Sequence, residues 1–205
     1  MPAIEVVKGR WRPHKPVLHS RIQRCLAVTA ANPLLQDFDL PPYSQIKPEH
    51  VEPAIDSILA DSRVAIAELL KTQQVNPSWD GLVLALDELN ARLGRAWGPV
   101  SHLNAVCNNA ELRAAYEACL PKLSQYWTEL GQNEALYAAY KKLAKSAAFK
   151  KYSVARKTIV EHALRDFRLS GAELPDSDKP RFTEIQLQLA DFLTTPHHHD
   201  TDPVR

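Results

Sequence analysis

The 205-residue sequence is 45% hydrophobic and 24% charged, which is ordinary for a globular chain with one sizeable core. Its net charge of +1 combines six Lys/Arg and one acid in residues 1–30 with a mildly acidic remainder. Basic and acidic side chains in that remainder are mixed along the expected helices, which argues against a nucleic-acid binder.

The cysteines and the apolar runs bear on the compartment. Cys25, Cys107 and Cys119 are odd in number and form no CxxC pair, so they indicate neither a disulfide framework nor a thiolate zinc site. No apolar run approaches the roughly 18 residues of a membrane span. We therefore expect a cytoplasmic protein without a membrane partner.

Residues 1–31 are expected to form a basic, disordered extension. They show no helical periodicity and lack the apolar core of a secretory signal. An Arg-rich, acid-poor segment resembles a transit peptide, but Pro13 and Pro16 would break the amphipathic helix that such a peptide needs. We interpret the segment as a flexible tail or as a start codon assigned too early, with a targeting peptide as the alternative.

A helical domain is expected over residues 32–192. Paired Pro41 and Pro42 predict an extended lead-in, and Pro48 suits the first turn of a helix in which Glu49 and Glu52 favour the N-terminus. Apolar residues of this helix recur at spacings of three and four, which predicts one core-facing side: Val51, Ile55, Ile58, Leu59, Ile66, Leu69 and Leu70.

A second helix is expected to begin at Ser78, a natural N-cap, and to end at Gly98 and Pro99. Its apolar stripe is formed by Leu82, Leu86, Leu89, Leu93 and Trp97. A separate short element, 100–106, should follow it.

Asn109 is then expected to cap a helical region of about eight turns, at 3.6 residues per turn. Its stripe is formed by Leu112, Tyr116, Cys119, Leu123, Tyr126, Leu130, Tyr137 and Tyr140. Pro121 lies inside this stripe, which predicts a kink near Glu117 rather than two separate helices.

Two further helices are expected. One runs from about Ser153 to Gly171, with Ile159, Ala163 and Phe167 on one face. The other starts near Asp178 and Pro180, with a stripe formed by Phe182, Ile185, Leu189 and Phe192. No segment alternates with period two, so the predicted fold class is all-α, a kinked antiparallel helical domain. Residues 193–205 read as a disordered polar tail.

A helical enzyme could carry HExxH, which places two histidines on one helix face for zinc with a glutamate to activate water. That motif is absent from the sequence. Glu49–His50 and Glu161–His162 reverse the pair and lack the second histidine, so we interpret both as half-exposed helix residues. His197, His198 and His199 are adjacent in the tail and do not define a closed tetrahedral site.

Nucleophile and phosphate motifs give no candidate either. Cys107 follows His102 by five residues, but no third partner is visible, and a packed small residue is the simpler interpretation. GxSxG, GxGxxG and GxxxxGK[ST] are all absent. The aromatic residues Tyr116, Tyr126, Trp127, Tyr137 and Tyr140 are expected to make core and helix contacts rather than a ligand box. We therefore predict no catalytic, cofactor-binding or metal-binding residue.

Three stretches carry a family resemblance. They are NPLLQDFDLPPYSQIKPEHVEPAI (32–55), GPVSHLNAVCNNAELRAAYEACLPKLSQYWTELGQNEALYAAYKKL (98–143) and ALRDFRLSGAELP (163–175). In this order they resemble the N-terminal helical region of the oligopeptidase A and thimet oligopeptidase family of zinc metallopeptidases. On this resemblance, Arg95 to Glu117 is scaffold, in which a Gly98–Pro99 stop and the Asn109 cap orient the third helix.

The resemblance implies an almost wholly helical fold whose two lobes flank a channel for short peptides, with the N-terminal lobe as one wall. Zinc, HExxH and a further glutamate ligand belong to the later part of the family's chain, which this sequence lacks. After Phe192 the residues match nothing in the family, as a frameshift or early stop would leave. We expect a truncated relative that does not hydrolyse peptides alone and whose partners are a separate catalytic half or short peptides. The alternative is a freestanding helical binding module.

Overall fold

Seven α-helices make up the part of the chain that the structure describes. The computed structural model describes residues 32–107 and 109–194, and within them the all-α class is confirmed and no strand occurs. The α-helices are α1 (Pro48–Gln73), α2 (Ala85–Val106), α3 (Ala110–Gly131), α4 (Glu134–Ala144), α5 (Ala147–Lys150), α6 (Val154–Leu169) and α7 (Lys179–Thr194). Shorter segments are the 3-10 helices η3 (Pro33–Leu35) and η4 (Tyr43–Gln45) and the π-helix η5 (Trp79–Leu84).

Several predictions concern residues outside that part. The basic extension 1–31, His197, His198 and His199, and almost all of the tail 193–205 lie outside the described residues. The domain boundaries at residues 32 and 192 therefore stay predictions. Among the described residues, no helix is both long enough and apolar enough to span a bilayer.

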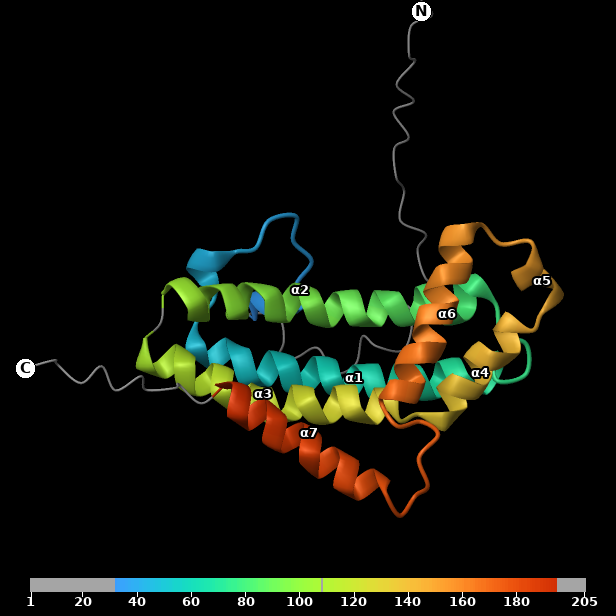
Figure 1. The fold of residues 1–205 in the computed structure, drawn as a ribbon. Coiled ribbons are helices and arrows are strands. Elements are labelled where there is room, and N and C mark those ends of the chain that lie inside the picture. Colours follow the sequence, from blue (N-terminus) through green and yellow to red (C-terminus); the bar gives the residue numbers. More distant parts are fainter. Residues whose placement is uncertain (1–31, 108, 195–205) are drawn as a thin grey trace, which may run out of the picture. The chain divides into compact units, whose positions relative to one another are not determined.

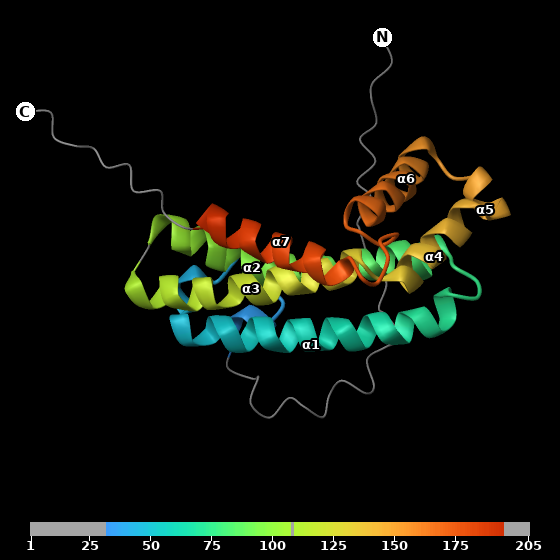
Figure 2. The ribbon, with the colours of Figure 1, turned by 60° about the horizontal axis from the view of Figure 1, so that its bottom comes forward.

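The three longest helices lie side by side (Figure 1). Short turns join α1 to α2 and α2 to α3, so consecutive helices run antiparallel. α1 packs against both α2 and α3, and α7 lies along α3 (Figure 2). α4 continues beyond α3 and packs against α5 and α6, so these three helices form one end of the bundle.

The core is built around the apolar side of α1. Val51, Ala54, Ile55, Ile58, Leu59 and Ile66 are buried, and Leu69 and Leu70 are partly buried, which confirms the predicted stripe. The other long helices contribute buried residues at helical spacing: Leu86, Leu93, Ala96 and Val100 from α2, and Leu112, Cys119, Leu123 and Tyr126 from α3. The bundle therefore closes around one continuous apolar cluster.

Side-chain caps start most of the helices. The Ser78 hydroxyl accepts from the Gly81 amide, and the Asn109 side chain accepts from the Leu112 amide, so both predicted caps are confirmed. Ser153 caps α6 through the Arg156 amide. Gly171 has a φ of 90°, a left-handed conformation that suits glycine and ends α6. The segment after Ser78 opens as a π-helix, a detail that its cap does not encode.

The predicted stop at Gly98 and Pro99 is wrong. α2 runs through both residues to Val106, so the expected separate element 100–106 is its last part. Proline removes one helical hydrogen bond, but Ala96, Pro99 and Val100 are all buried against the core, and this packing keeps the helix intact. The helix therefore ends at Val106 rather than at Gly98, and α3 begins at Ala110.

The predicted eight-turn rod is also wrong, because α3 ends at Gly131 and α4 begins after Asn133. The Asn133 side chain accepts from the Leu136 amide and so caps a new helix. Pro121 lies inside α3, which confirms one unbroken helix across this proline. The kink near Glu117 stays a prediction in position and angle.

The two C-terminal helices follow the predicted apolar faces only in part. In α6, Phe167 is buried and Ala163 is partly buried, as predicted, whereas Ile159 is 49% exposed and the adjacent Val160 is fully buried in its place. In α7, Phe182, Thr183 and Gln186 are half-buried, whereas Ile185 and Leu189 of the predicted stripe are exposed. The described residues thus leave Ile185 and Leu189 uncovered.

Candidate functional site

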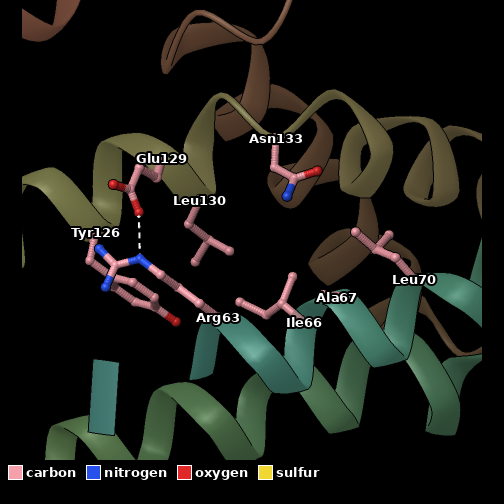
Figure 3. Close-up of a pocket in the computed structure, with 8 residues that line it drawn as sticks. All are labelled: Arg63, Ile66, Ala67, Leu70, Tyr126, Glu129, Leu130 and Asn133. Atoms are coloured by element: carbon pink, nitrogen blue, oxygen red, sulfur yellow. Dashed lines mark hydrogen bonds and ion pairs between the residues drawn. The ribbon is translucent and has the colours of Figure 1, made fainter. Parts of the chain in front are cut away.

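A groove lies between α1 and α3 in the described part of the chain (Figure 3). It has a volume of about 260 Å³. Its lining consists of Arg63, Ile66, Ala67, Leu70, Tyr126, Glu129, Leu130 and Asn133. The apolar side chains come from the ends of both helices, while a charged pair stands at one edge (Figure 3).

That charged pair joins residues far apart in the sequence. The Arg63 Nε donates to Glu129 Oε2 at 2.8 Å, and the Gln125 amide donates to the other Glu129 oxygen at 2.7 Å. The Arg63 guanidinium carbon also lies 5.6 Å from the centre of the Tyr126 ring. Burial raises the pKa of the Tyr126 hydroxyl, which the neighbouring Ser62 hydroxyl and the Arg63 charge partly oppose. At the edge of the groove, the Arg63 cation therefore lies near the uncharged phenol ring of Tyr126.

A second hollow adjoins the first along the same helix seam. It is lined by Asp56, Leu59, Arg63, Lys122, Gln125 and Glu129. The Lys122 ammonium donates to Asp56 at 2.8 Å and to Glu52 at 2.7 Å, and these bonds raise the pKa of Lys122. Since the acidic and basic side chains of this seam form ion pairs with one another, none of them is free to act as a proton-transfer group.

The histidines considered from the sequence are not gathered into a metal site. His50 Nδ1 accepts from the Lys47 amide at 3.2 Å, so its ring closes the first turn of α1. His162 is exposed on α6 beside exposed Glu161. Over residues 32–107 and 109–194, no three His, Cys, Asp or Glu side chains lie close enough to hold a metal ion. These residues do not fit the zinc site that the family resemblance implies for full-length members.

Cys107 and His102 have separate surroundings. The exposed Cys107 caps the C-terminus of α2, whereas the His102 ring lies 5.3 Å from the Tyr43 ring. Cys119 is fully buried in α3. Burial raises the pKa of the Cys119 thiol to about 11, although the charge on Lys122 acts in the opposite direction. Cys119 is therefore a packed thiol and not a nucleophile at neutral pH.

Thiol labelling should separate these two cysteines. At pH 8, we expect iodoacetamide to modify Cys107 at least about tenfold faster than Cys119, because the buried thiol reacts only when the structure opens. Mass spectrometry of tryptic peptides after timed quenching measures both rates. In guanidinium chloride the two rates should become similar, and equal rates in the native protein would contradict the described burial.

The aromatic residues behave largely as expected for core contacts. Tyr126, Tyr137 and Tyr140 are buried, and Tyr116 stacks on Trp97 with ring centres 4.7 Å apart. Burial, with a smaller contribution from Asp87, raises the pKa of Tyr140 to about 12. Trp127 is the exception, since it is 45% exposed.

α7 is a second candidate surface. Its exposed apolar residues are Ile185 (47%), Leu187 (39%) and Leu189 (50%). Its start is held by polar contacts instead: Lys179 donates to Asp176 at 2.8 Å and also to Glu134. Just before the helix, the Tyr137 hydroxyl donates to Glu173 at 2.5 Å. α7 is therefore fixed at one end and presents Ile185 and Leu189 together on one side that the described residues leave uncovered, with Leu187 exposed on another side.

Sequence reasoning predicted neither surface. The groove joins residues of α1 and α3 that are about sixty positions apart, and no local pattern connects them. Periodicity placed Ile185 and Leu189 on one side of α7 but could not tell that the described residues leave both exposed.

The groove and the α7 surface belong to a domain with known relatives. A family model described as "Neurolysin/Thimet oligopeptidase, N-terminal domain" matches residues 55–179. Oligopeptidase A of Haemophilus influenzae is 48% identical over 165 residues, and oligopeptidase A of Escherichia coli is 46% identical over 161 residues. These alignments cover 80% and 78% of this chain but 24% of each relative.

More distant similarity extends to another peptidase. A dipeptidyl carboxypeptidase of Salmonella typhimurium is 25% identical over 169 residues, which is 80% of this chain and 25% of that protein. The chain thus spans about a quarter of the length of the relatives it matches. Because the family model covers more than half of the sequence, the chain belongs to the neurolysin/thimet oligopeptidase family and carries its N-terminal domain.

Proposed function

We propose that this chain supplies one wall of the peptide channel of an oligopeptidase A-like enzyme in the cytoplasm. On this proposal the 205 residues do not hydrolyse peptides by themselves. Hydrolysis of short peptides would require a second polypeptide that carries HExxH and the zinc ligands. The observation that carries the proposal is the uncovered apolar side of α7 in a domain that spans a quarter of its relatives.

The physical reason is that apolar side chains exposed to water are stabilised when another surface covers them. Ile185 and Leu189 are 47% and 50% exposed on one side of α7, Leu187 is 39% exposed on another side, and the helix packs on α3. Burying a Leu or Ile side chain stabilises a contact by about 1.5–3 kcal/mol, so covering these residues favours association with a complementary surface. The polar contacts at Lys179 keep α7 in place for such an association.

A reconstitution experiment tests the proposal. The purified chain is mixed with oligopeptidase A of Haemophilus influenzae from which the N-terminal domain has been removed, and cleavage of a quenched fluorescent peptide is followed in the presence of zinc. We expect no cleavage by the chain alone and chelator-sensitive cleavage by the mixture. Chelator-sensitive turnover by the chain alone, retained through purification, would show that the proposal is wrong.

Paired variants connect reconstitution to α7. Ile185→Asp with Leu189→Asp should lower the reconstituted activity at limiting concentration at least about tenfold, because two apolar contacts are lost. Val64→Asp with Val75→Asp is the matched control, since both valines are exposed (65% and 72%) and lie outside α7. Equal activities of the two variants would exclude α7 as the contact surface.

A second candidate function is a freestanding helical module that binds peptides or a protein. The groove of about 260 Å³ between α1 and α3 favours it, because apolar lining with a charged edge suits a peptide side chain. Hydrodynamic size and dye binding distinguish the two functions. A monodisperse monomer with a cooperative melt supports the module, whereas aggregation or binding of a hydrophobic dye supports a domain made for a partner.

A further inference from the structure

The end of the bundle formed by α4, α5 and α6 is strongly basic. Between residues 141 and 168 the sequence contains nine Lys/Arg and two acids, whereas residues 32–140 contain seven Lys/Arg and fourteen acids. The nine are Lys141, Lys142, Lys145, Lys150, Lys151, Arg156, Lys157, Arg165 and Arg168. The mixing of charges expected along the helices therefore fails in this segment, which we name the basic end.

The two parts of the chain also differ in how their cations are partnered. At least five of the seven Lys/Arg in residues 32–140 lie within 4 Å of a carboxylate: Lys47, Arg63, Lys71, Arg92 and Lys122. Of the nine in the basic end, Arg165 alone has a carboxylate partner among the described residues, the adjacent Asp166. Among the described residues, most cations of the basic end thus lack a carboxylate partner, whereas most cations of residues 32–140 have one.

Chain connectivity keeps these cations close together. α4, α5 and α6 follow one another with links of two and three residues, and α4 packs against both of the others (Figure 1). Lys150 ends the four-residue α5, Lys145 lies just before this helix and Lys151 just after it, and all three are exposed. Like charges at such spacing repel one another and lower the stability of the fold, so fold stability does not account for them.

Three apolar side chains are exposed among the cations. Val154 is 81% exposed, Leu169 is 72% exposed, and Ile159 lies between them on the same helix. Polar His162 and Asp166 separate Ile159 from Leu169, so α6 has no continuous apolar face of the kind that enters a bilayer. The surface is instead cationic with scattered apolar contacts.

The aromatic rings of the basic end pack on one another. Tyr152 contacts the rings of Trp79 and Phe149, and the Arg156 guanidinium lies 4.8 Å from the centre of the Trp79 ring. Single-stranded nucleic acids are usually held by aromatic rings that are open to base stacking. With the rings engaged internally, the basic end suits carboxylates better than bases.

We propose that the basic end is a docking site for an acidic polypeptide segment, in which carboxylates pair with exposed lysines that have no carboxylate partner among the described residues, and apolar residues contact Val154, Ile159 and Leu169. Charge complementarity selects this occupant, because the surface offers unneutralised cations and separate apolar contacts rather than a groove or a membrane-binding face. The proposal goes beyond the channel-wall function and needs no catalytic half, so either can fail without the other.

Fluorescence anisotropy of the full 205-residue chain tests this site. The probe is a labelled dodecapeptide of four Glu-Glu-Leu repeats, measured at low salt and again at a salt concentration where exposed charges are largely screened. We expect binding at low salt that weakens markedly at high salt. A peptide of four Lys-Lys-Leu repeats should not bind.

Variants of equal charge locate the interaction. Lys145→Gln with Lys150→Gln and Lys151→Gln should weaken binding of the acidic peptide about tenfold, because three exposed ion pairs are lost. The control is Lys47→Gln with Lys71→Gln and Arg95→Gln, which removes three exposed cations outside the basic end and should change the affinity less than about twofold.

Four results would overturn the proposal. They are no binding of the acidic peptide at low salt, equal weakening in both triple variants, tighter binding of a twelve-nucleotide oligothymidylate, and tighter binding to phosphatidylserine vesicles. A lower melting temperature of the Lys145/Lys150/Lys151 variant would show that these lysines stabilise the fold, and this result would also contradict the proposal. An unchanged or raised melting temperature, together with weaker binding, supports a recognition role.

Discussion

Replacing Ile55 by alanine is expected to lower the free energy of unfolding by about 2–5 kcal/mol. Ile55 is fully buried in the middle of the apolar side of α1, the helix that packs on both α2 and α3. Truncation removes three carbons from water-excluded contacts and leaves a cavity that two neighbouring helices cannot close by a simple shift. Since small domains are stable by about 5–15 kcal/mol, this one change removes a large share of the total.

Urea unfolding followed by circular dichroism measures this effect. Val64→Ala is the control on the same helix, because Val64 is 65% exposed and its truncation should change the free energy by less than about 0.5 kcal/mol. Ile55→Val should fall between the two, at about 0.5–1.5 kcal/mol. If Ile55→Ala and Val64→Ala unfold at the same urea concentration, the described packing of α1 is wrong.

Gly131→Ala is expected to destabilise the fold by about 1–3 kcal/mol, although alanine is the better helix former. A Cβ atom at Gly131 would lie 2.5 Å from Ser170 Cβ and 2.8 Å from Ser170 Oγ. The Cβ of Ser170 is fixed to the backbone at the end of α6, so it cannot rotate away. The end of α3 or of α6 must therefore move, which strains the contact between α4 and α6.

A double-mutant cycle separates crowding from other causes. Ser170→Gly removes the two atoms that an alanine at 131 would meet, and the next atom, Ser170 Cα, is at an ordinary distance of 4.0 Å. In the Ser170→Gly background, Gly131→Ala should become neutral or stabilising by up to about 1 kcal/mol, as helix propensity predicts. A loss of the same size in both backgrounds would mean that residues other than Ser170 cause it.

Local signals in the sequence predicted the helix starts well. Ser78, Asn109 and Ser153 each cap a helix through the amide three residues onward, an interaction whose partners are neighbours in the chain. The apolar side of α1 is equally local, because its spacing follows from 3.6 residues per turn. The fold keeps these features because its tertiary contacts favour the same helix starts and the same buried side of α1.

Non-local contacts decided the features that sequence reasoning missed. Pro99 would end an isolated helix, but the burial of Pro99 and Val100 carries α2 onward. The end of α3 coincides with the approach of Ser170 to Gly131, a contact between residues thirty-nine positions apart. The groove between α1 and α3 and the uncovered side of α7 likewise depend on which helices become neighbours. The charge excess of the basic end follows from the sequence alone, but it emerges only when Lys/Arg and Asp/Glu are counted segment by segment.

The unequal distribution of charge has a consequence for motion in solution as well as for binding at equilibrium. With a surplus of seven positive charges in residues 141–168 and of seven negative charges in residues 32–140, the described domain is an electric dipole. An approaching polyanion exerts a torque on a dipole, so the domain turns its basic end toward that anion before any contact forms. Encounters then begin in one orientation, and added salt slows the rate of association more than it speeds the rate of release.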